Sequence, residues 1–243
     1  MLQELLKLMR ERHSSRQAFD PKRRLSEADL NLILEAARWA PTAHNMQNYE
    51  VLVVDEPVTL AAIAAYRSQP SETFLRENYQ QLAFSEDELK ARKTGVLASM
   101  FPPSWRTPEP KPHEAVDLEH TFLGRSLKQC PALLIVAYDT RKRAPASEGD
   151  VLGIMSLGCV MQNIWLMAAN LGIAMQILSA FNAREAEDHL RGFLAIPEHM
   201  QIAFTCRLGY ALPGSHHYLR VRRDVPEFVH RNRFGNPHKG EAP

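Results

Sequence analysis

The first of two short polar clusters is suited by residue type and spacing to binding a phosphate. It is the run Arg12-His13-Ser14-Ser15-Arg16. Its two guanidinium groups flank hydroxyls, and such forks donate paired, charge-assisted hydrogen bonds to a dianionic phosphate. Strings of this kind also occur on solvated surfaces, so the pattern alone leaves a phosphate site and an ordinary basic surface both open.

A second polar cluster lies between an expected helix and an apolar strand. It spans residues 40–49 with the sequence APTAHNMQNY, so hydroxyl, amide and imidazole groups share one short loop. Such groups can hydrogen-bond the edge of a flat heteroaromatic ring or a polyol. A helix C-terminus followed by a turn explains much of the same composition, so both interpretations stay open at this point.

Several catalytic motifs are absent from the sequence. No G-x-G-x-x-G follows a strand and begins a helix, so a Rossmann dinucleotide site is not supported. The motifs G-x-x-x-x-G-K-[ST], H-E-x-x-H and G-x-S-x-G are missing as well. The chain therefore lacks the usual signatures of a P-loop, a zinc protease and a serine hydrolase.

The three cysteines are interpreted as buried structural thiols. Cys130, Cys159 and Cys206 lie far apart and form no C-x-x-C pair, which argues against a zinc knuckle and a disulfide framework. A buried thiol behaves mainly as a small apolar side chain. The residues expected to alternate onto one strand face are Ile202, Phe204, Cys206 and Leu208.

One polar stretch has side chains of the types that hold metal ions. His113, Glu114, Asp117, Glu119 and His120 would place two histidines and a carboxylate on one helical face. We favour a solvated polar helix here, because charged residues at helical spacing usually form a wet face. No metal is therefore expected.

Composition excludes several classes of protein. The 243 residues carry 29 Lys and Arg against 28 Asp and Glu, a net charge of +1, whereas nucleic-acid binders are usually strongly basic. With 45% hydrophobic and 23% charged residues, the chain is expected to fold around a core. The N-terminus mixes charge into its apolar residues, unlike a signal peptide, and the apolar runs are shorter than a membrane span. We expect a cytoplasmic protein with no nucleic-acid or membrane partner.

The near-neutral total conceals two basic ends. Residues 1–24 hold seven Lys and Arg against three acids, and residues 220–233 hold five arginines against two acids. The balanced total is thus an average over two basic ends and an ordinary mixed surface along the rest of the chain.

Hydrophobic spacing predicts the elements that hold these clusters. Ser26 and Asp29 fit a capping box, and Pro41 ends the helix that follows. Residues 150–170 are apolar on nearly every side, which predicts a buried helix. Helices and strands mix without regular β-α-β alternation, which indicates an α+β fold. We expect helices at residues 2–9, 26–40, 59–66, 86–97, 150–170 and 184–194, and strands at 51–54, 133–138, 173–178 and 202–208.

The chain is expected to form one domain over residues 1–243, with an insertion at about 68–115. The insertion is irregular and rich in proline, as lids and edge decorations often are. Its segment Met100–Trp105 has two open interpretations: a lid that covers the ligand and selects the substrate, or an aromatic-proline clamp on a dimer surface.

In this order and spacing, the polar clusters resemble those of the FMN-dependent nitroreductase family. That family begins with a helix ending in R-x-S-x-R or R-H-S-x-K and an aromatic residue, here Phe19. A-P-S-x-x-N-x-Q-P-W follows and leads into an apolar strand. Two further matches are the buried helix, turn and short strand over Gly158–Asn182, and the end of the chain. The end has Gly209-Tyr210, a Pro-Gly turn, Arg220-Val221-Arg222-Arg223 and then Val229–Gly235.

The resemblance implies a three-layer α/β/α sandwich with a mixed, largely antiparallel sheet, an intertwined homodimer, and FMN at the dimer interface. Hydride would come from NAD(P)H and pass to a small planar acceptor such as a nitroaromatic or a quinone. The flavin would carry the chemistry, so no catalytic side chain is expected. A fixed cation such as Arg16 would stabilise the negative charge of reduced FMN at N1 and O2.

The same resemblance implies a set of cofactor-binding residues. Arg12, His13, Ser14 and Arg16 would line the ribityl phosphate and the pyrimidine edge, with Arg220 and Arg222 near the phosphate. Pro41, Thr42, Ala43 and Asn45 would reach the flavin of the other subunit. The backbone N–H groups of Leu178, Ser179 and Ala180 would approach flavin N5.

Two departures from the family pattern, and two other kinds of function, accompany this interpretation. Asn48-Tyr49 replaces Pro-Trp, which alters local packing, and Ala180 replaces a frequent glycine but keeps the backbone donor. The family also hosts reductive dehalogenation and flavin fragmentation. A non-catalytic flavin-binding protein is the alternative from a different class, and neither the substrate nor the preference for NADH or NADPH follows from the sequence.

Overall fold

The computed structural model describes residues 2–66, 73, 76–100, 124, 127, 129–182, 184–214 and 218–238. The chain forms two compact units. The first comprises Met1–Pro70 and Glu114–His216, and the second comprises Ser71–His113 and His217–Pro243. The predicted insertion at about 68–115 thus supplies the earlier part of the second unit, while its role as a lid and the single-domain description stay predictions.

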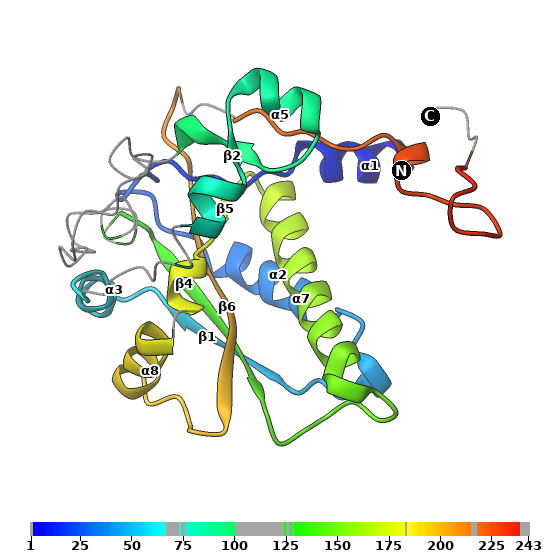
Figure 1. The fold of residues 1–243 in the computed structure, drawn as a ribbon. Coiled ribbons are helices and arrows are strands. Elements are labelled where there is room, and N and C mark those ends of the chain that lie inside the picture. Colours follow the sequence, from blue (N-terminus) through cyan, green and yellow to red (C-terminus); the bar gives the residue numbers. More distant parts are fainter. Residues whose placement is uncertain are drawn as a thin grey trace. The chain divides into compact units, whose positions relative to one another are not determined.

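An antiparallel four-stranded sheet forms the centre of the first unit (Figure 1). β-branched and aliphatic residues dominate its strands, as is usual where both faces are covered. In spatial order the strands are β1 (Tyr49–Val54), β4 (Ala132–Asp139), β6 (Met200–Gly209) and β5 (Ala174–Ile177). The only parallel pairing between strands of the described residues, β2 (Ala83–Phe84) with β3 (Val96–Leu97), belongs to the second unit.

One face of the sheet is covered by α2 (Glu27–Arg38) and α7 (Val151–Asn170). α2 begins at the predicted Ser26 cap, whose Oγ accepts from the Asp29 N–H at 3.0 Å. α1 (Leu2–Glu11) also contacts α7. The core on this face is contributed mainly by Ile33, Ala37, Leu134, Val136, Val160, Ile164, Phe204, Cys206 and Leu208.

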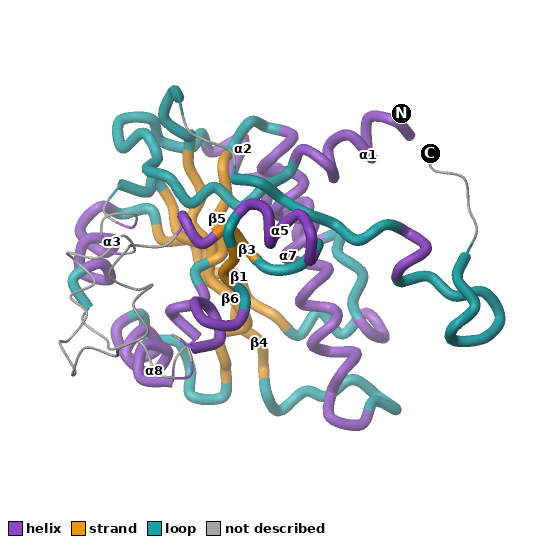
Figure 2. Tube along the Cα trace, turned by 45° about the horizontal axis from the view of Figure 1, so that its top comes forward, coloured by secondary structure: helices purple, strands orange, loops and turns teal. Residues whose placement is uncertain are grey.

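The opposite face is covered by α3 (Pro57–Ala64) and α8 (Arg184–Phe193), so the helices lie on both sides of the strands (Figures 1 and 2). Its core includes Leu60, Ile63, Leu133, Ile135, Leu190 and Ile202. Successive residues of β4 alternate between the two cores, as the two-residue period of a strand requires. The predicted three-layer α/β/α arrangement is confirmed.

A bulge in β6 corrects one expectation from the sequence. Val136 of β4 pairs with Phe204, but the next residue, Ala137, pairs with Ile202. Ala203 is therefore the extra residue, and it reverses the faces on its two sides. Phe204, Cys206 and Leu208 share one core as predicted, whereas Ile202 lies in the other.

The long helix α7 is less buried than its composition predicts. Val160, Ile164 and Ala168 pack into the core, but Val151, Ile154 and Met155 are more than half exposed. The helix from Glu148 to Asn170 is long and apolar enough to cross a membrane by length and composition, a test that core helices of soluble proteins also pass. α7 thus packs on the sheet with one side and leaves an apolar stripe on another.

The second unit is built from short elements. Lys93 contacts Asp224 at 2.6 Å and Glu227 at 2.7 Å, which joins its two chain segments. The helix predicted at 86–97 ends earlier, at Arg92, because Lys93 adopts a left-handed conformation and a strand follows. The elements are η2 (Arg76–Gln81), β2 (Ala83–Phe84), α5 (Glu86–Arg92), β3 (Val96–Leu97), η3 (Ala98–Met100) and η7 (Val225–Glu227). In the first unit, η1 (Ala43–Asn45), η5 (Glu148–Asp150) and η6 (Ser179–Asn182) complete the assignment.

Candidate flavin site

The basic cluster at residues 12–16 follows α1 and lies along the edge strand β5. Ser14 forms a parallel bridge with Met175, and the Ser15 N–H donates to the Met175 carbonyl at 2.8 Å. β5 leads directly into the predicted donor loop that begins at Leu178. The fold therefore places the basic cluster and this donor loop along the same strand, although 160 residues separate them in the sequence.

A tryptophan of α7 holds the start of the basic cluster. The Trp165 Nε1–H donates to the His13 carbonyl at 3.2 Å, and the Arg12 guanidinium lies 4.2 Å from the centre of a Trp165 ring. The His13 ring, through Nδ1, contacts the Glu11 carbonyl at 3.1 Å. Cation–π stacking limits the orientations of a guanidinium and leaves its N–H edges able to donate.

No sequence motif pointed to the residue that holds the end of this cluster. Arg207 on β6 has no exposed surface, and its Nη2 donates to the carbonyls of Ser15 at 3.2 Å and Gln17 at 2.5 Å. Its Nε donates to the Gln176 side chain at 2.8 Å, and its guanidinium lies 4.1 Å from the centre of the Phe19 ring. Burial lowers the pKa of Arg207 to about 10, so it remains a cation at neutral pH.

The aromatic residue after the cluster is fully buried against β6. Phe19 bridges to Ala211 and lies directly over Gly209. A Cβ atom at Gly209 would come within 2.6 Å of the Phe19 ring and of the Pro131 Cδ. The glycine before Tyr210 is thus required by close packing, which gives a physical reason for two parts of the family pattern.

The donor loop after β5 is partly engaged within the protein. The Leu178 N–H donates to the Thr205 carbonyl at 2.9 Å, and the Thr205 hydroxyl donates to the Leu178 carbonyl at 3.0 Å. Ser179 is exposed, and the backbone of Ala180 continues η6. Because the Leu178 N–H already has an acceptor, Ser179 and Ala180 are the better placed of the three to donate to a ligand.

The second polar cluster forms a loop with an unusual backbone. His44, Asn45 and Gln47 have φ values of 50°, 53° and 45°, which are rarely adopted by residues other than glycine. Local contacts hold these conformations: the Gln47 N–H donates to Thr42 Oγ1 at 3.2 Å and its side chain donates to Asn45 Oδ1 at 2.9 Å. Such strained loops are concentrated at binding and active sites.

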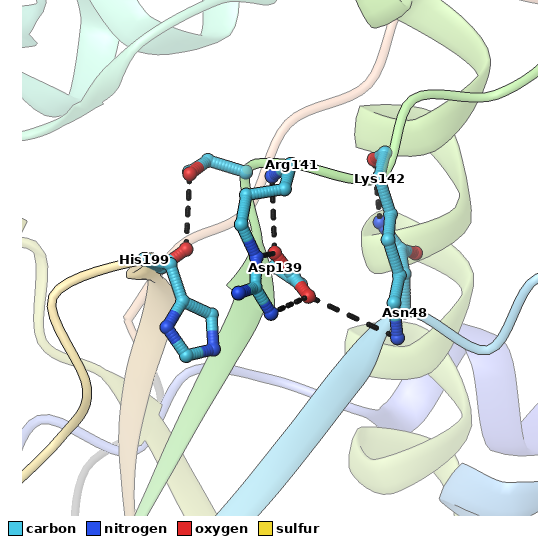
Figure 3. A network of polar contacts seen from close by, with 6 residues as sticks. Asn48, Asp139, Arg141, Lys142 and His199 are labelled. Carbon is cyan, nitrogen blue, oxygen red and sulfur yellow. Dashed lines mark hydrogen bonds and ion pairs between the residues drawn. The ribbon is translucent and has the colours of Figure 1, made fainter.

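Contacts with α7 and β4 fix both ends of this loop. The Ala43 N–H donates to Ser156 Oγ of α7 at 2.9 Å. At the other end, the Asp139 N–H donates to the Asn48 carbonyl at 3.1 Å, and the Asn48 side chain donates to the Lys142 carbonyl at 3.4 Å (Figure 3). Asn48, which replaces proline in the family pattern, thus joins the loop to the end of β4.

The carboxylate of Asp139 and its polar contacts support this junction (Figure 3). Asp139 is buried and accepts from Arg141 Nε at 2.9 Å, from Arg141 Nη2 at 2.8 Å and from the Arg141 N–H at 3.0 Å. These hydrogen bonds hold the pKa of Asp139 well below its ordinary value. The contacts with Arg141 therefore keep the Asp139 carboxylate ionised at neutral pH.

The two polar clusters occupy different levels of α7 in one chain. Ser156 anchors the 40–49 loop and Trp165 anchors the basic cluster, nine residues apart on the helix. At a rise of about 1.5 Å per residue, the anchors are separated by roughly 13 Å. The loop and the basic cluster of one chain are thus anchored apart, which is compatible with the prediction that the loop reaches the flavin of the other subunit.

The remaining predicted site residues lie in the 40–49 loop and in the second unit. Pro41 and Asn45 are exposed, and Thr42 and Ala43 are half-buried. Arg220 and Arg222 lie in the second unit and are exposed, with Arg222 Nη1 donating to the Val221 carbonyl at 2.7 Å.

The donor set in the first unit fits a phosphate-bearing ligand. Arg12, Ser14 and Arg16 are half-buried on a fixed backbone, which favours anion binding over a freely solvated surface. The described part of the chain has no group of three or more His, Cys, Asp or Glu residues that could hold a metal ion. The polar stretch His113–His120 lies outside the described residues.

The cysteines fit a structural role better than a nucleophilic one. Burial raises the pKa of Cys130 to about 12 and also raises that of Cys206. Cys159, expected to be buried, is half-buried on α7. The two buried thiols are therefore protonated at neutral pH.

Comparison with known proteins agrees with this geometry. A model of the Nitroreductase family matches residues 9–210, which include the basic cluster, the 40–49 loop and Arg207. The chain belongs to the nitroreductase family. A search of curated proteins finds no match.

Solved structures share the nitroreductase fold at low sequence identity. A nitroreductase with bound FMN from Desulfitobacterium hafniense is 21% identical, with a TM-score of 0.58, 95% of this chain covered and 100% of the other. One with bound FMN from Bacteroides fragilis is 20% identical, with a TM-score of 0.54 and coverage of 90% and 95%. A candidate NADH dehydrogenase/NAD(P)H nitroreductase from Bacteroides thetaiotaomicron is 16% identical, with a TM-score of 0.59 and coverage of 95% and 98%.

Proposed function

We propose that this nitroreductase-family protein is an FMN-dependent oxidoreductase that takes hydride from NAD(P)H and reduces a small planar acceptor such as a nitroaromatic or a quinone. The observation that carries the proposal is the attachment of Arg12–Arg16 along β5, whose end leads into Leu178–Ala180. Cations for a phosphate and backbone donors for a ring are thereby held on one strand. FMN-bound relatives with the same fold support the choice of cofactor.

Each group in this chain has a stated task in the proposal. Arg12 and Ser14 bind the phosphate. Arg16 opposes negative charge at the pyrimidine edge, and the N–H groups of Ser179 and Ala180 orient the ring. When bound, FMN supplies hydride acceptance and release, so the protein contributes binding, orientation and charge stabilisation.

The working form is proposed to be a homodimer with flavin at the interface. The exposed apolar stripe on α7 would be covered by a second copy, together with Leu5, Leu6 and Met9 of α1, each at least 40% exposed. A second copy would also bring its own 40–49 loop to the basic cluster of the first chain, from which the first chain's own loop is separated. Pro41, Thr42, Ala43 and Asn45 would then contact the flavin of the partner. We further propose that the dimer is cytoplasmic.

Two half-reactions test the function. The purified protein is saturated with FMN and freed of oxygen. It is then mixed with NADH or NADPH while the flavin absorbance at ~450 nm is recorded. We expect rapid bleaching and full recovery of colour when a nitroaromatic or a quinone is added. Flavin that binds but is bleached by neither nicotinamide would contradict the oxidoreductase assignment and favour a non-catalytic binder.

A further inference from the structure

We propose that Arg207 is a positioning residue for the flavin site: it preforms the Ser15–Gln17 backbone that carries Arg16, the cation assigned to the pyrimidine edge of the flavin. This inference rests on the proposed function for its ligand but not for its structural part. No sequence pattern pointed to Arg207, because its neighbours on β6 are core residues. Its contacts, not its position in a motif, assign the role.

The contacts fix every second carbonyl of the segment. Arg207 Nη2 donates to the carbonyls of Ser15 and Gln17, at 3.2 and 2.5 Å. Because a trans peptide directs its C=O and the following N–H to opposite sides, the N–H groups of Arg16 and Ala18 face away from Arg207. The guanidinium thus sets the orientation of two peptide planes, one before Arg16 and one after Gln17.

The guanidinium is itself held from two directions. Gln176 of β5 accepts from its Nε at 2.8 Å, and the Phe19 ring lies 4.1 Å from its central carbon. Gln176 directly follows Met175, which accepts from the Ser15 N–H. One buried side chain therefore joins β6, β5 and the basic segment, so the segment is ordered before any ligand arrives.

Burial of a cation also has an electrostatic consequence. Arg207 has no exposed surface, and a buried charge is screened less than a solvated one. Its field adds to that of Arg12 and Arg16 and favours an anion on the segment. An apolar replacement would remove both the field and the two carbonyl contacts, whereas lysine would keep the charge without the planar fork.

Amide hydrogen exchange on the FMN-free protein tests the structural part. In Arg207→Met, the amides of residues 15–19 should exchange faster by about tenfold or more, because two carbonyls lose a charged donor. The β4 amides of Leu134 and Val136 should keep their protection in Arg207→Met. The control Ile33→Ala weakens the core cluster that does not contain Phe19, and it should not selectively accelerate exchange at residues 15–19. Unchanged exchange at 15–19 in Arg207→Met overturns the proposal.

Chemical rescue separates positioning from general loss of packing. In Arg207→Ala, millimolar guanidinium should restore both the amide protection and the FMN affinity, while sodium chloride at equal ionic strength should not. Arg207→Lys should fall between the wild type and Arg207→Met in FMN affinity. A full loss in Arg207→Ala that guanidinium does not reverse would contradict the role.

The failure of this inference can be told apart from failure of the proposed function. If the wild-type protein takes up no FMN, the proposed function fails, and the exchange experiment still decides whether Arg207 orders the segment. If FMN binds equally to the wild type and Arg207→Met, the oxidoreductase assignment stands and the positioning role is wrong.

Discussion

At the scale of single residues, close packing and buried charge decide the geometry of the candidate site. The Phe19 ring packs against both Gly209 and the Arg207 guanidinium, which lie two residues apart on β6. Gly209 belongs to the family pattern at the end of the chain, whereas Arg207 lies outside every motif quoted for the family. The positions of the flavin-binding side chains on this segment therefore depend on the buried groups that hold its backbone.

The fit at Gly209 gives a stability prediction. Gly209→Ala should lower the free energy of unfolding by about 1–3 kcal/mol, because the new methyl group meets the Phe19 ring and Pro131. Gly192→Ala on α8 is the matched control, since no atom lies within 4 Å of its added Cβ. That control should be neutral or stabilising by up to about 1 kcal/mol. Equal effects of both changes in urea unfolding would contradict the packing argument.

The carboxylate at the end of β4 gives a pH prediction. The pKa of Asp139 is lowered in the folded protein, first by the Arg141 side-chain hydrogen bond. Its stabilisation is therefore present above the unfolded pKa of about 3.9 and is lost as pH falls through the lower folded value. Asp139→Asn should unfold at less urea than wild type at pH 7, and the difference should shrink below about pH 4. The exposed Asp55→Asn should leave the midpoint unchanged; a constant difference for Asp139→Asn at all pH values would refute the linkage.

At the scale of elements, the long helix α7 organises both polar clusters. Trp165 holds the basic cluster, Ser156 holds the 40–49 loop, and the Asn163 side chain donates to the Ala36 carbonyl of α2 at 2.9 Å. Side chains that can donate or accept hydrogen bonds thus mark the points where other segments attach to this largely apolar helix. The helix acts as the common support for two parts of the proposed site.

Ser156 offers a test of this support. Its hydroxyl accepts from the Ala43 N–H and donates to the Leu152 carbonyl at 2.7 Å. Ser156→Ala should lower stability by about 1–3 kcal/mol, because a half-buried N–H loses its acceptor. The amides of the 43–48 loop should also exchange faster, whereas those at 15–19 should not. Equal acceleration of both segments would show that the loop is not held locally.

Sequence reasoning predicted the elements better than their details. Capping at Ser26 and the apolar run of β4 marked true elements, because local signals and the core agree there. The bulge at Ala203 and the left-handed backbone of His44, Asn45 and Gln47 involve no glycine. His and Asn adopt this conformation more often than most residues but do not require it, so the sequence did not reveal these features. Arg207 was missed for a similar reason: its role depends on carbonyls about 190 residues away.

At the scale of the whole molecule, the exposed apolar stripe of α7 predicts self-association. Ile154→Asp should convert a dimer into a monomer in sedimentation experiments, because a charge would have to be buried in the α7 interface. Val58→Asp on α3 is the control, since Val58 is 75% exposed on the other layer. A wild-type monomer, or a dimer that survives Ile154→Asp, would contradict the proposed assembly.

The central claim, that a basic cluster binds the phosphate of FMN, is tested most directly by titrating the protein with FMN and with riboflavin, which lacks the phosphate. The wild type should bind FMN more tightly by about tenfold or more, since charged hydrogen bonds to the phosphate each contribute about 1.5–3 kcal/mol. In the double variant Arg12→Ala, Ser14→Ala, the preference should largely disappear while riboflavin affinity is kept. A double variant that retains the wild-type preference for FMN would contradict the account.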